Sequence, residues 1–101
     1  MTPATLSPAA SQDLKAATRW IAKDNPAAAH ALRRSLERAA ITIGENRYFG
    51  RLRPEIVSAP YRLLGLTGFP YVIIYNAERT PPRIMRVLHG ARDLPEVLRD
   101  L

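Results

Sequence analysis

The stretch RIMRVLHGARD at residues 83–93 decides how the second half of the chain folds. Its apolar side chains predict a β-strand over residues 83–88, ended by the glycine two positions later. Alternation along a strand predicts that Ile84, Arg86 and Leu88 share one face of the sheet. A charged Arg86 in the middle of a central strand is costly unless it pairs with an acidic group or faces a groove.

Two further apolar runs precede this strand, at residues 61–66 and 71–75, and turn-forming residues separate all three. Short connections between neighbouring strands predict an antiparallel meander. Residues 3–6 could add a short first strand. The segment 45–60 has the composition of an exposed loop, and its basic residues are Arg47, Arg51 and Arg53.

Helical spacing of apolar residues predicts two helices in the first half, over residues 8–23 and 26–43. Each begins with a capping residue followed by proline, and Gly44 is expected to cap the end of the second. The tight connection between them predicts an antiparallel hairpin. A short helix is expected over residues 94–101. The predicted fold is α+β, a single domain over residues 1–101 with the hairpin packed on a three- to four-stranded antiparallel sheet.

The composition is basic and contains no cysteine. Fifteen Lys and Arg against nine Asp and Glu give a net charge of +6 over 101 residues. Such a surface favours nucleic acid, an acidic protein partner, or both, although an arginine bias can also reflect the base composition of a gene. No apolar run approaches the ~20 residues of a membrane span, and the first residues do not resemble a signal peptide. We therefore expect a cytoplasmic protein without a membrane partner.

The usual signatures of a small-molecule enzyme are missing from the sequence. The five glycines are scattered, so they do not form a phosphate-binding loop, and the two histidines lack acidic neighbours at metal-ligand spacing. No serine lies in a recognisable nucleophile motif. We expect no cofactor, no metal and no small-molecule substrate.

The arginines near the C-terminus have two interpretations. Arg86 or Arg92 could form a structural ion pair with Asp93 or Glu96 that holds the last helix against the sheet. Alternatively, these cations could face a phosphate group.

The phosphate interpretation depends on which side chains the sheet brings together. If the strands pair in chain order, Arg62 lies close to Arg86, and with His89 the two could contact a phosphodiester backbone. Trp20 lies between apolar positions of the first helix, which favours packing in the core or the hairpin over contact with a partner.

Four stretches of the chain resemble the ParE branch of the ParE/RelE superfamily, the toxins of bacterial type II toxin–antitoxin pairs. They are IAKDNPAAA at residues 21–29, Tyr-Arg at 61–62, YVIIY at 71–75 and IMRVLHGARD at 84–93. The last stretch is the most specific, and it resembles ParE more than RelE.

This resemblance implies a helix hairpin on a small antiparallel sheet and a cognate, ParD-like antitoxin whose C-terminal segment folds as it binds. It also implies that the toxin inhibits DNA gyrase without making or breaking a bond, and that it meets operator DNA only through the antitoxin. The candidate target-binding residues are Arg62, Arg86, His89 and Arg92. The candidate antitoxin-binding residues are Trp20, Tyr71 and Tyr75.

RelE-type relatives instead cleave mRNA on the ribosome, and Arg62, Arg86 and His89 would be the catalytic residues under that alternative. A metal-free ribonuclease needs a base, an acid and cations around the phosphate. No Tyr or His follows Asp93, and the sheet half contains no lysine. The sequence therefore favours gyrase inhibition over RNA cleavage, and a toxin that has lost its activity is a third alternative.

Overall fold

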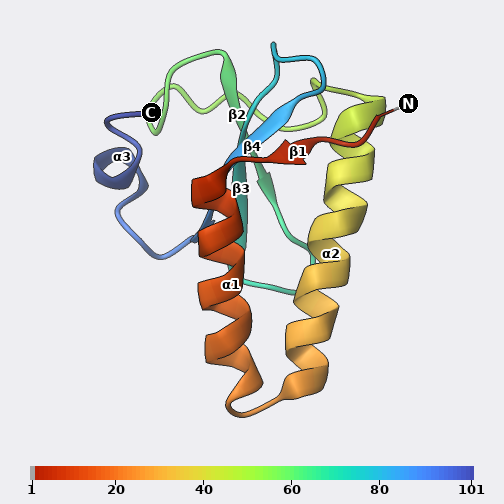
Figure 1. Cartoon of the computed structure of the whole chain (residues 1–101). Coiled ribbons are helices and arrows are strands. Elements are labelled where there is room, and N and C mark those ends of the chain that lie inside the picture. Colours follow the sequence, from red (N-terminus) through yellow and green to blue (C-terminus); the bar gives the residue numbers. More distant parts are fainter. Residues whose placement is uncertain (1) are drawn as a thin grey trace.

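The helices and strands follow the order that the sequence predicts, in a computed structural model that describes residues 2–101 (Figure 1). They are β1 (Thr5–Leu6), α1 (Pro8–Ala22), α2 (Pro26–Glu45), β2 (Tyr61–Gly65), β3 (Tyr71–Asn76), β4 (Arg83–His89) and α3 (Leu94–Val97). The two long helices form the predicted antiparallel hairpin against the sheet, and α3 lies on the side away from α2 (Figure 1). The predicted α+β fold is confirmed. No helix among the described residues is long and apolar enough to cross a membrane.

Both long helices begin at side-chain caps. The Ser7 hydroxyl accepts a hydrogen bond from Ala10 N at 3.0 Å, and Asn25 Oδ1 accepts one from Ala28 N at 3.1 Å. Each cap satisfies an N–H group that has no partner within its helix, and the proline that follows needs none. The starts of both helices are therefore set by local sequence.

The end of α2 differs from the prediction because Gly44 is not its cap. The helix continues to Glu45, and Asn46 ends it. A Cβ atom at Gly44 would lie only 2.8 Å from Pro3 Cα and would also clash with the Thr2 carbonyl. Glycine at this position lets the N-terminal segment cross close to the helix backbone.

The sheet has the order β1-β4-β3-β2 and is mixed, whereas the sequence predicted a purely antiparallel one. The meander β2-β3-β4 is antiparallel as expected, but β1 pairs with β4 in parallel. Short turns force antiparallel pairing only between strands that follow one another. Because the hairpin and two strands separate β1 from β4, no turn sets their relative direction.

A bulge between β3 and β4 overturns the predicted alternation in β4. Ile74 lies opposite Arg86, while the next residue, Tyr75, lies opposite Ile84. One extra residue in β4 shifts the side chains before it to the other face. Ile84 therefore packs with Val87 beneath the helix hairpin, and not with Leu88.

Both faces of the sheet carry an apolar cluster. The larger cluster lies between the sheet and the hairpin, and its fully buried members include Leu32, Ile43, Ile73 and Ile84. The smaller cluster packs the opposite face against α3 and the segment before β2, through Val57, Leu63, Ile74, Leu88, Leu94 and Leu98. The sheet is therefore a central layer covered on both sides.

The segment between α2 and β2, predicted as an exposed loop, is partly fixed to the sheet. The Tyr75 hydroxyl donates to the Arg47 carbonyl at 2.8 Å and accepts from Gly50 N at 2.8 Å. Arg51 and Leu63 exchange two backbone hydrogen bonds, at 2.8 and 2.9 Å. The Arg47 guanidinium donates to the Ala77 carbonyl at 3.1 Å, so it joins two loops instead of lying free in solvent.

Candidate functional site

A surface groove of about 210 Å³ lies between α1 and the C-terminal end of β4. We call it the α1–β4 groove, and it is lined by Asp13, Ala16, Ala17, Trp20, Tyr71, Val87, Leu88, His89 and Arg92. Four of the residues selected from the sequence meet here, namely Trp20, Tyr71, His89 and Arg92. The two antitoxin candidates and two target candidates among them therefore share one surface.

Trp20 is exposed, so the expectation that it packs in the core or the hairpin is wrong. The buried positions of α1 are Ala10, Leu14 and Ala17, and Trp20 is 69% exposed. The ammonium of Lys23 lies 5.1 Å from the centre of the indole ring, which is within cation–π range. A tryptophan presented to solvent in this way is a frequent anchor of protein interfaces.

Tyr71 and His89 form a cross-strand pair at the other wall of the groove. They lie opposite each other in β3 and β4, with ring centres 5.4 Å apart and ring planes at 71°. The His89 Nδ1 atom accepts a hydrogen bond from Ala91 N at 3.1 Å. Since Nδ1 accepts, Nε2 is the ring nitrogen available to bind a partner.

Arg86 is held by an acid that the sequence did not identify. Its Nε donates to Asp13 Oδ2 at 2.7 Å and its second terminal nitrogen donates to Asp13 Oδ1 at 3.0 Å. This hydrogen bonding raises the pKa of Arg86, against the opposing effect of burial. The ion pair predicted with Asp93 or Glu96 is therefore wrong in its partner, because α1 and not the last helix supplies the acid.

Asp13 also closes the open edge of β4. Its Oδ2 atom accepts the backbone N–H of Val87 at 3.0 Å, beyond the point where the two-residue strand β1 ends. The Ser7 hydroxyl donates to the Met85 carbonyl at 2.8 Å on the same edge. Neither contact is visible in the sequence, because each joins residues more than seventy positions apart.

Arg62 does not lie beside Arg86, contrary to expectation. Arg62 is in β2 and Arg86 is in β4, and β3 lies between these two strands. Arg62 is opposite Tyr75, a member of the larger cluster, whereas Arg86 is opposite Ile74, a member of the smaller cluster on the other face. The Arg62 guanidinium donates to the Gly50 carbonyl at 2.9 Å and lies over the Tyr48 ring. Arg62 therefore fixes the loop before β2 and is separate from the α1–β4 groove.

Tyr75 is fully buried, so its side chain is not available to an antitoxin. Burial raises the pKa of its hydroxyl, while the hydrogen bond from Gly50 and the charge of Arg62 act in the opposite direction. Its two hydrogen bonds show a structural role, which is to hold the loop after α2 against the sheet.

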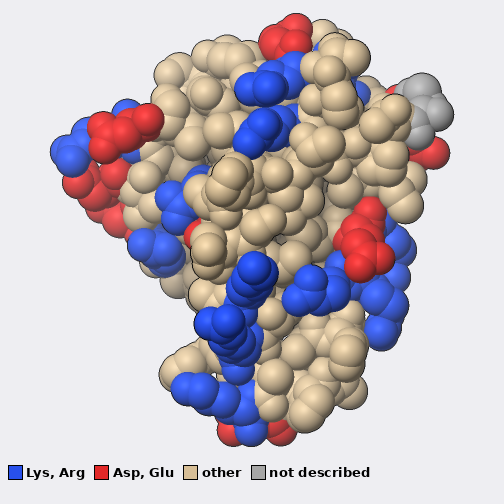
Figure 2. All heavy atoms as spheres, viewed as in Figure 1, with Lys and Arg blue, Asp and Glu red and all other residues tan. Residues whose placement is uncertain are grey.

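The charge distribution leaves Arg92 available. The ion pairs within residues 2–101 are Arg53–Glu55, Arg86–Asp13 and Arg99–Glu96, so Arg92 takes part in none of them. On the face drawn in Figure 2, basic side chains run down the middle of the molecule, and most acidic ones lie toward its margin. Among the described residues, no three His, Cys, Asp or Glu side chains are grouped so that they could hold a metal ion.

The fold and the groove together define a class of protein. It is a small basic α+β domain with a helix hairpin on one face of its sheet and an aromatic, cationic groove at the edge. Such a surface can bind a macromolecule through an aromatic anchor and the guanidinium of Arg92.

The chain belongs to the ParE toxin family. The family described as "ParE toxin of type II toxin-antitoxin system, parDE" matches residues 4–94, which confirms the resemblance found in the sequence. A solved structure described as "Chromosomal ParDE TA system from P. aeruginosa" has the same fold, with a TM-score of 0.72 and 18% sequence identity. The match covers 88% of this chain and 96% of that chain. No curated protein sequence matches.

Proposed function

We propose that this member of the ParE toxin family inhibits DNA gyrase and is neutralised by a ParD-like antitoxin. The observation that carries the proposal is the α1–β4 groove, where the exposed Trp20 lies near His89 and the unpaired Arg92. A groove of this kind is suited to binding a protein surface. We expect the toxin to act in the cytoplasm and to reach operator DNA only as part of its complex with the antitoxin.

Inhibition by binding accounts for the geometry better than RNA cleavage does. The residues required by the ribonuclease alternative are Arg62, Arg86 and His89. Arg86 is occupied by Asp13, and Arg62 lies across β3 with its guanidinium bound to the loop before β2. A phosphate held by His89 would therefore lack both of the arginines that this alternative assigns to stabilising the charge of the transition state.

The same groove suggests how an antitoxin could neutralise the toxin. Trp20 and Tyr71, the remaining antitoxin candidates, line it together with the target candidates His89 and Arg92. A partner anchored on the two aromatic rings would also cover His89 and Arg92. The net charge of +6 favours an antitoxin segment that is acidic.

The proposal is tested by expressing the chain alone and together with the product of the neighbouring antitoxin gene. Expression alone should stop growth, induce the DNA-damage response and leave mRNA intact, and co-expression should restore growth. The purified toxin should inhibit supercoiling of relaxed plasmid by gyrase. Rapid mRNA cleavage on ribosomes, with gyrase unaffected, would show instead that the chain is a ribonuclease.

A further inference from the structure

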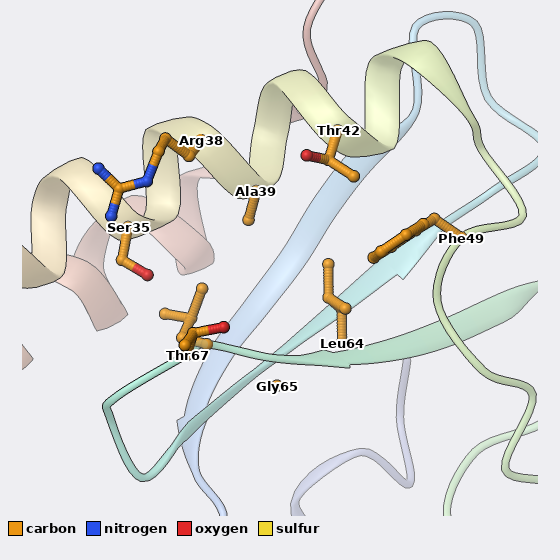
Figure 3. A pocket seen from close by; sticks show the side chains of 9 residues that line it. Ser35, Arg38, Ala39, Thr42, Phe49, Leu64, Gly65 and Thr67 are labelled. Atoms are coloured by element: carbon orange, nitrogen blue, oxygen red, sulfur yellow. The ribbon is translucent and has the colours of Figure 1, made fainter.

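A second groove, of about 230 Å³, lies between α2 and the outer edge of the sheet. We call it the α2–β2 groove (Figure 3). Ala39 from α2 and Leu64 from β2 face each other across it, and the ring of Phe49 closes one end. Because β2 and β4 lie on opposite sides of β3, this groove is distinct from the α1–β4 groove.

Strand β2 has an unpaired backbone position in this groove. Leu66 N donates to the Tyr71 carbonyl, so Leu66 and every second residue before it direct their backbone groups toward β3. Leu63 and Gly65 therefore direct theirs outward. Leu63 is satisfied by the two hydrogen bonds with Arg51. Gly65 lies opposite Val72 of β3, but among the described residues no backbone hydrogen bond reaches its outward N–H and C=O groups.

The chain itself turns away where it could have covered Gly65. If the pairing of Arg51 with Leu63 continued, Phe49 would come to lie opposite Gly65. Instead, Phe49 N donates to the Asn46 carbonyl in a turn, and Gly50 N donates to the Tyr75 hydroxyl. A Cβ atom placed on Gly65 would meet nothing within 4 Å.

The walls of the groove offer further polar groups without partners. The hydroxyls of Ser35, Thr42 and Thr67 line it, and none takes part in a side-chain hydrogen bond among residues 2–101. Arg38 lies at the rim and is in none of the ion pairs within the described chain. Polar groups around a small apolar floor are typical of a binding site.

We propose that the α2–β2 groove binds an extended, acidic segment of a partner protein, which adds as a short strand beside Gly65. Backbone groups of the segment would pair with the N–H and C=O of Gly65, an apolar side chain would lie over Ala39, and a carboxylate would bind Arg38. This inference rests on the proposed function, since it assigns the segment to the antitoxin.

Charge favours this occupant over a second copy of the chain. Pairing two copies through β2 would bring together two molecules of charge +6 and two Arg38 side chains. An extended backbone can meet the outward N–H and C=O groups of Gly65 beside the Arg51–Leu63 pair. An extended acidic segment could therefore hydrogen-bond the open edge of β2 at Gly65 and form an ion pair with Arg38.

Charge reversal on α2 tests the proposal. Arg38→Glu should weaken binding of the purified antitoxin, and of a synthetic peptide of its C-terminal segment, by ~10-fold, equivalent to about 1.4 kcal/mol. Arg34→Glu is the matched control, because Arg34 is an exposed arginine of the same helix that does not line the groove. Titration calorimetry at two salt concentrations measures both variants, and the difference between them should shrink at high salt.

Hydrogen exchange tests the added strand directly. The Gly65 amide should exchange rapidly in the isolated toxin and at least ~10-fold more slowly in the toxin–antitoxin complex. Equal affinities of the Arg38→Glu and Arg34→Glu variants, or an unprotected Gly65 amide in the complex, would overturn the proposal. Protection of Gly65 in a dimer of the toxin alone would also overturn it, in favour of self-association. If the toxin does not inhibit gyrase, the proposed target is wrong, but these binding results still decide whether the α2–β2 groove binds the antitoxin.

Discussion

Asp13 in α1 holds Arg86 in β4 through two hydrogen bonds, of 2.7 and 3.0 Å, and accepts the Val87 N–H with the same carboxylate. The carboxylate thus joins the first helix to the strand that carries the family-specific residues. The side chains of Asp13 and Arg86 are only 14% and 25% exposed, so water compensates little for the loss of either one. Arg86 is therefore assigned to the architecture of the toxin.

Replacing Arg86 should consequently destabilise the fold. We expect Arg86→Met to lower the free energy of unfolding by about 1–3 kcal/mol, because Asp13 would keep a partly buried charge without its cation. Urea denaturation measures the loss. Arg99→Met removes an exposed pair with Glu96 and should cost less than about 0.5 kcal/mol. Equal effects of the two variants would contradict the structural role of Arg86.

Tyr75 should stabilise the protein in a pH-dependent manner. We expect Tyr75→Phe to lower the free energy of unfolding by about 1–2 kcal/mol, since Gly50 N and the Arg47 carbonyl would lose their partner. Tyr48→Phe, at an exposed ring, is the control.

The raised pKa of Tyr75 fixes the direction of the pH effect. Its stabilising contribution is complete below the pKa of an unfolded tyrosine, about 10, and is lost as the pH rises from there through the folded pKa. Denaturation between pH 8 and pH 11 should therefore show a steeper loss of stability for the wild type than for Tyr75→Phe. Identical slopes would mean that the Tyr75 pKa is the same in the folded and unfolded states.

Local signals in the sequence located the elements well, and long-range contacts account for most errors. The caps at Ser7 and Asn25 act within three residues of themselves, so they could be recognised from the sequence. The pairing of Asp13 with Arg86 spans 73 positions, and the sequence offers several other acids as partners. The parallel direction of β1 likewise depends on packing that no turn specifies.

Two local departures from regular patterning account for the remaining errors at the site: an extra residue in β4 and an apolar side chain of α1 that is exposed. The bulge before Arg86 breaks the period-two alternation, so the faces of β4 could not be assigned by counting from Ile84. Trp20 lies one turn after the buried Ala17 of α1, and hydrophobicity alone placed it inside. Whether its ring is buried depends on what the fold packs against this side of α1, which local patterning does not encode.

Gly44 should be required for the close approach of the N-terminal segment to α2. Alanine is the better helix former by ~1 kcal/mol, so propensity alone predicts that Gly44→Ala stabilises the protein. We expect instead a net destabilisation of about 1–3 kcal/mol, because the new methyl group would overlap Thr2 and Pro3. Gly65→Ala is the control, since its methyl group meets nothing within 4 Å, and it should be neutral or slightly stabilising. Thermal denaturation of both variants measures whether each substitution stabilises or destabilises the protein.

Trp20 should contribute to antitoxin binding and not to stability. Because its ring is 69% exposed, Trp20→Ala should change the free energy of unfolding by less than about 0.5 kcal/mol. The same variant should bind the antitoxin ~10- to 100-fold more weakly, as expected for an aromatic anchor. Trp20→Phe, which keeps an aromatic ring, should retain much of the affinity. Unchanged binding by Trp20→Ala would exclude the α1–β4 groove from the antitoxin interface.

Arg92 should act on the target side of the same groove. Its side chain lines the groove beside His89 and forms no ion pair within the described chain, so a charge reversal costs the fold little. We expect Arg92→Glu to raise the toxin concentration that half-inhibits gyrase supercoiling by ~10-fold, because it replaces an attractive charge with a repulsive one. Arg34→Glu makes the same charge change on α2 and should leave inhibition unchanged. If both variants lose inhibition equally, overall charge governs the encounter with gyrase, and the groove does not form the contact.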